Sequence, residues 1–284
     1  MADASPGTTG PSRGGRLLFG RVRPFDAIRT IARSPLSSLD TMMFEDARLA
    51  EGLGVDRAQI ARWRRQLTGT SRLPQELADR WAQSGEGPYT GGDTTTVGNE
   101  VLYLFVRAAR PERIVETGVA AGFSSSYLLQ GLADNGGGRM VSIDLPTLDP
   151  SGRVDRDGVT DRSRVRSAER TGFIVPDRLR DRWELRLGDA KELLPRTLGE
   201  LAPIDLFFHD SDHSYDHMLW EYRTAWPLLR AGGWLLSDDV TRNRAFPDFC
   251  REVGVERPVR WAFGKWRGRA GIRKPLRTRS GPDA

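Results

Sequence analysis

The sequence has little of several features that would each define a class of protein. Cys250 is the only cysteine among 284 residues, which excludes an internal disulfide and a zinc site built from several cysteines. There are three histidines, and no apolar run approaches the length that spans a bilayer. Residues 1–15 are rich in Gly, Pro, Ser and Thr and lack the apolar segment of a secretory signal, so we expect a disordered leader. These absences predict a cytoplasmic protein with no membrane partner.

Aromatic and charged residues are present in quantity. The chain has 8 Trp and 11 Phe, enough for a substantial core, and 29% of its residues are charged. The formal charge of +5 is uneven, because residues 265–284 contain seven basic residues and one acid. We interpret this basic end as a solvated edge hairpin with a flexible tail at 277–284, and contact with nucleic acid is the alternative.

The apolar pattern alternates between strands and helices from residue 97 onward. Strands are predicted near 114–115 and over 139–146, 183–189, 204–210 and 234–240, and helices over 97–110, 127–134, 190–198, 215–229 and 246–253. Two further strands are predicted at 258–264 and 268–276. This order predicts an α/β fold with a doubly wound, mostly parallel seven-stranded sheet over residues 86–276.

The region before this domain has a helical pattern. Residues 36–83 are predicted to form short helices, and we assign residues 16–85 to a small helical cap over the domain. Basic residues flank Trp63, but Gly69–Ser71 and Pro74 do not form the short turn of a helix-turn-helix motif.

Residues 113–124, RIVETGVAAGFS, combine a predicted strand, a glycine turn and a helix that we expect the serines to cap. Glycines allow the backbone to approach a ligand, and a helix N-terminus offers free N–H groups. An ordinary turn between strand and helix is the alternative, because the dinucleotide pattern G-x-G-x-x-G is not matched. The order of Glu116, Gly118, Gly122 and Ser124 resembles the first motif of class I S-adenosylmethionine-dependent methyltransferases. That resemblance implies that this turn binds the methionine part of the cofactor.

Two more acids are expected at neighbouring strand ends. Asp144 could accept hydrogen bonds from both hydroxyls of a ribose, or it could cap the following turn. Asp189 ends the third strand, and the same resemblance places this position beside the adenine.

All three histidines lie in the segment HDSDHSYDH after the fourth strand. Their spacing of four residues would align them on one helix as a metal site. We reject this site because His209 belongs to the strand and the helix begins later. His209 is expected to support the turn, and His217 to lie on the solvent side of its helix.

Acids also end the fourth and fifth strands. Asp210, Asp238 and Asp239 are expected to converge, and carboxylates that converge suit a hard cation such as Mg²⁺. The alternative is that Asp239 points outward or caps a turn. The runs IDLFFHDSDH and LLSDDV resemble metal-dependent O-methyltransferases of the catechol, caffeoyl-coenzyme A and macrolide-sugar type. The resemblance implies these three acids as metal ligands, with Asp210 also next to the cofactor, and His213 as the general base.

The sequence therefore predicts methyl transfer from S-adenosylmethionine to a hydroxyl of a sugar, polyketide or phenol, the long segment 146–182 acting as a lid. Open alternatives are a metal-independent or nucleic-acid-directed methyltransferase, a non-catalytic protein that binds S-adenosylmethionine, and a metal hydrolase. Nucleic acid is not the expected partner, and whether the chain forms a homo-oligomer is left open.

Overall fold

The computed structural model describes residues 45–85, 96–146, 153–154, 160–161, 168–261 and 268–276, all within a compact unit that spans residues 41–284. The predicted leader and basic tail lie outside the described residues, as do residues 16–44 of the predicted cap. No helix in the described ranges is long and apolar enough to cross a membrane.

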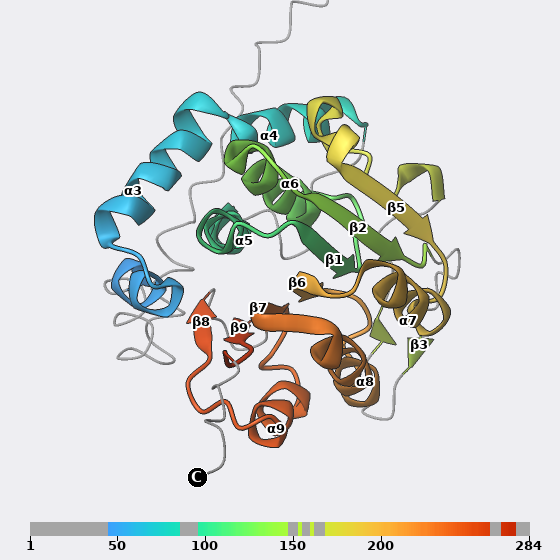
Figure 1. The fold of residues 1–284 in the computed structure, drawn as a ribbon. Helices are drawn as coiled ribbons and strands as arrows, with labels where there is room; N and C mark the ends of the chain where they lie inside the picture. The colour runs from blue at the N-terminus through green and yellow to red at the C-terminus, as the bar shows by residue number, and fades with distance from the viewer. Residues whose placement is uncertain are drawn as a thin grey trace, which may run out of the picture. The chain divides into compact units, whose positions relative to one another are not determined.

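The centre of the fold is a seven-stranded sheet with the strand order β5-β2-β1-β6-β7-β9-β8 (Figure 1). The strands are β1 (Arg113–Thr117), β2 (Arg139–Asp144), β5 (Trp183–Leu187), β6 (Ile204–His209), β7 (Leu229–Ser237), β8 (Val259–Trp261) and β9 (Arg269–Arg273). The first five in this order pair in parallel, and β9 pairs antiparallel with both β7 and β8. The strand order reverses next to β1, where ligands bind in such sheets. The predicted mostly parallel, doubly wound sheet is confirmed. A separate pair, β3 (Arg153–Val154) and β4 (Thr160–Asp161), is antiparallel.

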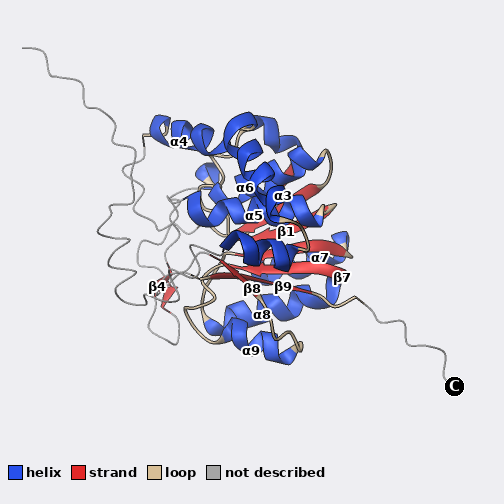
Figure 2. Cartoon of the chain, turned by 90° about the vertical axis from the view of Figure 1, so that its left-hand side faces the viewer, coloured by secondary structure: helices blue, strands red, loops and turns tan. Residues whose placement is uncertain are grey.

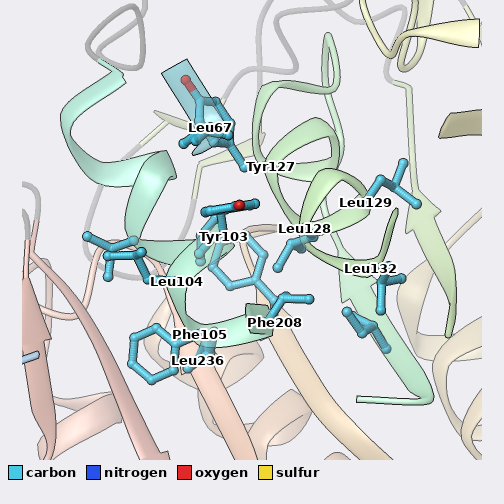
Figure 3. Close-up of a cluster of buried hydrophobic side chains, with 14 of the residues drawn as sticks. Leu67, Tyr103, Leu104, Phe105, Tyr127, Leu128, Leu129, Leu132, Phe208 and Leu236 are labelled. Carbon is cyan, nitrogen blue, oxygen red and sulfur yellow. The ribbon is translucent and has the colours of Figure 1, made fainter. Parts of the chain in front are cut away.

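Helices cover both faces of the sheet, as parallel connections require. One face carries α5 (Thr96–Ala109) and α6 (Phe123–Asn135), and the other carries α7 (Ala190–Leu201), α8 (Tyr215–Ala225) and α9 (Ala245–Glu252) (Figure 2). Phe208 of β6 and Leu236 of β7 meet side chains of α5 and α6 in the first of two hydrophobic cores (Figure 3). Successive side chains of a strand point to opposite faces of the sheet, so the position of an acid in its strand determines the face it reaches.

The described part of the predicted cap is a helical layer that packs on α5 and α6. It comprises helical residues 45–53, α3 (Arg57–Arg65), a π-helical turn at Gln66–Thr70 and α4 (Leu73–Gln83). Ile60, Leu67 and Leu77 are buried in the same core as α5 and α6. Ion pairs from Arg80 to Asp177 and from Glu76 to Arg178 join α4 to the segment before β5.

Two features at the far end of the sheet differ from the sequence prediction. The helix predicted over 215–229 ends at Ala225, and β7 begins at Leu229. Gly233 therefore lies inside a strand, where a Cβ would stand 2.9 Å from the carbonyl oxygen of Asp205. The predicted edge hairpin is also wrong in part, because β9 lies between two strands and Arg269 is buried at 6% exposure.

Candidate active site

The glycine turn after β1 is in close contact with two other segments. Gly118 has φ 83° and Gly122 has φ 99°, conformations that side chains rarely adopt. A Cβ on Gly118 would lie 2.0 Å from the carbonyl oxygen of Asp210, and one on Gly122 would lie 3.0 Å from the Cα of Gly172. Glycine is therefore needed at both positions. The turn is held against the loop that follows β6. The turn predicted to bind the cofactor and the loop predicted to bind a metal are therefore neighbours.

Glu116 lies beneath this turn and is completely buried. Its carboxylate accepts hydrogen bonds from the hydroxyls of Ser124 (3.0 Å), Ser125 (2.7 Å) and Ser142 (2.6 Å). Burial raises the pKa of Glu116 to about 7, although the hydroxyls oppose the rise. The expectation that the serines cap the helix is wrong. Gly122 is the N-cap residue of α6, and two of the serines hold Glu116 instead.

Asp144 and Asp189 occupy the ends of β2 and β5 differently. Asp144 accepts a hydrogen bond from the backbone N–H of Val119 at 3.0 Å and lies 3.5 Å from the hydroxyl of Thr171. Burial raises its pKa, because these neutral donors only partly compensate for lost water. Asp189 is the N-cap residue of α7 and accepts from the N–H of Lys191 at 2.9 Å. Asp144 thus borders the glycine turn, while Asp189 has an evident structural role.

The last part of the predicted lid, which spans residues 146–182, packs against the glycine turn. Gly172 N–H donates to the carbonyl of Ala120 at 2.8 Å, and Ile174 N–H donates to that of Ala121 at 3.2 Å. Residues 171–175 therefore form a wall fixed to the glycine turn. The lid remains a prediction for residues 147–152, 155–159 and 162–167, which lie outside the described ranges.

The loops after β6 and β7 bring together Asp210, His213 and Asp238, each with one possible ligand atom within 4.8 Å of the others. Nε2 of His213 is 3.7 Å from Oδ1 of Asp210. Asn243 donates to the carbonyl oxygen of His213 at 2.9 Å, so the loop after β7 also holds the loop after β6. The arrangement places two carboxylates and an imidazole at one point of the sheet edge.

Arg269 is a member of this cluster that the sequence did not predict. Its Nε donates to Oδ1 of Asp238 at 2.6 Å, and its Nη1 donates to Asn99 on α5. Burial alone would raise the pKa of Asp238, but the charges of Arg269 and His213 outweigh burial and hold that pKa well below its usual range. Asp238 is therefore ionised, and the guanidinium of Arg269 is its positively charged partner.

Asp239 is not a member of the three-residue group. It has a left-handed conformation with φ 48°, and its Oδ2 lies 3.7 Å from Nη1 of Arg242. Asp239 borders the site, and its predicted part in binding a metal is not tested by this geometry.

A second buried carboxylate, Glu221 on α8, lies beneath the loop after β6. It accepts from the hydroxyls of Thr117 and Ser211 at 2.6 and 2.8 Å. It also pairs with Nδ1 of His209 at 2.6 Å and Nε2 of His217 at 2.9 Å. The expectation that His217 faces solvent is wrong, since its side chain is buried against Glu221. The four-residue spacing between His217 and Glu221 was the available sequence signal for this cluster.

Comparison with known proteins gives a consistent result. Residues 115–240 match the family described as a methyltransferase domain. A putative O-methyltransferase from Klebsiella pneumoniae is 20% identical with a TM-score of 0.51, over 72% of this chain and 90% of that one. An O-methyltransferase from Bacillus cereus, solved in complex with SAH, is 20% identical with a TM-score of 0.50, over 72% and 91% of the two chains. No curated protein matches the sequence. At this identity the solved structures establish the fold, which is the one predicted.

Proposed function

We propose, from the methyltransferase domain of residues 115–240, that this protein transfers a methyl group from S-adenosylmethionine to a hydroxyl of a small molecule. The observation that carries the proposal is the backbone contact between Gly118 and Asp210. It places the turn proposed for the methyl donor beside the cluster proposed for the acceptor. Direct displacement at a methyl group requires such proximity, because the attacking oxygen must lie in line behind the carbon.

The donor half offers groups for each part of the cofactor. The glycine turn and the start of α6 would hold the methionine part, and Asp144 would accept hydrogen bonds from the ribose hydroxyls. Asp189 would lie near the adenine. The B. cereus O-methyltransferase of this fold was solved in complex with SAH, which supports a cofactor of this kind.

The acceptor half fits a divalent cation. Asp210 and Asp238 offer carboxylate oxygens, and Arg269 supplies one positive charge against these two acids. Asp210 and Asp238, together with Asp239, which follows Asp238 after β7, would hold Mg²⁺. The cation would lower the pKa of an acceptor hydroxyl. His213 would take the proton from that hydroxyl, since a neutral imidazole is a competent base near pH 7.

A test uses the full chain with tritium-labelled S-adenosylmethionine, with catechol and a methyl glycoside bearing vicinal hydroxyls as probe acceptors. We expect calorimetric binding of S-adenosylhomocysteine, and labelled product that disappears with EDTA and returns with Mg²⁺. Absence of cofactor binding would reject the proposed function. Unchanged turnover in EDTA would reject only the metal, and would favour a metal-independent enzyme in which Arg269 balances Asp238.

A further inference from the structure

Glu221 has no part in the chemistry proposed above, yet it connects the two halves of the site. The residue is completely buried on α8. Among the described residues, four side chains bond its carboxylate, contributed by β1, β6, the following loop and α8 itself. An ionised carboxylate accepts hydrogen bonds and donates none, so each of these four groups acts as a donor. Burial opposes ionisation, but the imidazoles of His209 and His217 outweigh burial and hold the pKa of Glu221 well below its usual range.

The two carboxylate oxygens of Glu221 have different partners. Oε2 accepts from Thr117 at the end of β1 and from His209 at the end of β6. Oε1 accepts from Ser211 in the loop after β6 and from His217 on α8. One oxygen therefore joins two strand ends, and the other joins the loop to the helix. Moving this carboxylate would loosen both connections at once.

His209 transmits this arrangement to His213. The two imidazole rings pack edge to face, with centroids 5.3 Å apart and planes at 74°. Nε2 of His209 is buried and has no hydrogen-bond partner among the described residues. Its bond to Glu221 is thus the polar contact that fixes the ring, and that ring is a wall against which His213 packs.

We infer that Glu221 is a positioning residue for methyl transfer. It holds the loop that carries Asp210 and His213 at a fixed distance from the glycine turn, and it sets the orientation of His213 through His209. The catalytic consequence rests on the proposed function, while the positioning itself can be measured without activity.

The test is Glu221→Gln, which keeps the size of the side chain and removes its charge. A crystal structure of the variant should show the His213 ring displaced and the glycine turn in place. The kcat should fall about 10- to 100-fold, as small misplacements of catalytic groups do. The affinity for S-adenosylhomocysteine should change by less than about 3-fold, which is less than the loss of one typical hydrogen bond.

The matched control is Asp205→Asn, at the opposite end of β6. Asp205 is also a buried acid, and it accepts from the backbone N–H groups of Glu112 and Arg113 at 2.9 and 2.8 Å. We expect this variant to be less stable but to keep the wild-type kcat. An equal loss of kcat in both variants would make Glu221 merely structural.

A double-mutant cycle with His213→Ala separates direct from indirect action. If Glu221 acts through His213, Glu221→Gln should change the residual activity of His213→Ala by less than about 2-fold. Full additivity would overturn the inference. Should Glu221→Gln fail to fold, Ser211→Ala removes one of the four donors, and we expect kcat to fall about 3- to 10-fold with unchanged cofactor affinity. An unchanged kcat and an unmoved His213 in that variant would reject the positioning role.

The outcome is separable from that of the proposed function. A wild-type chain that transfers no methyl group to any probe would reject the function, whereas the position of His213 in the variant crystal would still decide whether Glu221 positions it.

Discussion

Glu116 and Glu221 are both completely buried acids beneath the same edge of the sheet, one on each face. Glu116 is surrounded by three serine hydroxyls, and burial raises its pKa to about 7. Glu221 is paired with two imidazoles as well as two hydroxyls, and its pKa is lowered despite the same burial. Hydroxyls donate hydrogen bonds but supply no charge, so they cannot offset the loss of water around an ionised carboxylate.

The same difference separates the two halves of the candidate site. In the donor half, neutral donors surround Asp144 and its pKa is raised. In the acceptor half, the guanidinium of Arg269 holds the pKa of Asp238 low. Glu116 and Asp144 in the donor half accept hydrogen bonds from hydroxyls and a backbone N–H, and such acids suit the positively charged sulfonium ligand proposed there. In the acceptor half, by contrast, the carboxylate of Asp238 is paired with the guanidinium of Arg269.

The largest effect should come from His213, because it is the proposed base of the acceptor half. We expect His213→Ala to lower kcat about 10²- to 10⁴-fold, the usual contribution of general-base catalysis. Calorimetry with S-adenosylhomocysteine should give near wild-type affinity, since the donor half is unchanged. A collapse of cofactor affinity would mean that the two halves are not separate and that His213 is structural.

The second effect concerns stability and tests the contrast between the buried acids directly. A carboxyl whose pKa rises from 4.5 to about 7 on folding destabilises the fold by about 3 kcal/mol at pH 8. This penalty is absent below pH 4.5, grows between pH 4.5 and about 7, and is complete above that range. Glu116→Gln should therefore be more stable than wild type at pH 8 by up to this amount, and at pH 5 by less than about 1 kcal/mol.

Urea unfolding of both proteins at the two pH values measures this difference. Glu221→Gln is the opposite case, since a lowered pKa contributes stability above the unfolded value that is lost as the pH falls. It should be less stable than wild type at pH 8, and the deficit should shrink in acid. If the stability of both variants relative to wild type changed in the same direction with pH, the proposed difference between Glu116 and Glu221 would be wrong.

The smallest effect should come from Asp144, where a neutral isostere keeps the bond to Val119. We expect Asp144→Asn to weaken S-adenosylhomocysteine binding about 10-fold, through weaker bonds to the ribose. The kcat at saturating cofactor should change less than about 3-fold. Asp189→Asn is the companion variant, because asparagine caps helices as well as aspartate does. Loss of affinity there would reveal a cofactor contact beyond the cap of α7.

The sequence was sufficient for the sheet and for the residues at strand ends. Alternating apolar runs identified the parallel strands, and parallel strands bring their carboxyl ends to one edge, so Asp210 and Asp238 were expected to meet. Arg269 was not expected, because its contact depends on β9 pairing beside β7, which local periodicity does not specify. The partners of Glu116 were hidden for a similar reason, since Ser142 reaches it from the neighbouring strand.

The wrong expectation for His217 has a specific cause. Polar residues on a helix are assigned to solvent unless a buried partner is known, and the sequence alone does not identify Glu221, four residues later, as that partner. The hydrogen bond between His217 and Glu221 offsets the cost of burying each of them. The burial of either residue could therefore not be predicted without the other.

The contact between Gly118 and the carbonyl of Asp210 limits how the proposed methyltransferase could be re-engineered. A designer who grafts a loop from a relative after β6, to change the accepted molecule, alters the surface on which the donor turn rests. Only grafts that reproduce the backbone path at that one point would leave methyl-donor binding intact. Exchange of acceptor specificity should therefore proceed more easily through segments that leave this contact unchanged.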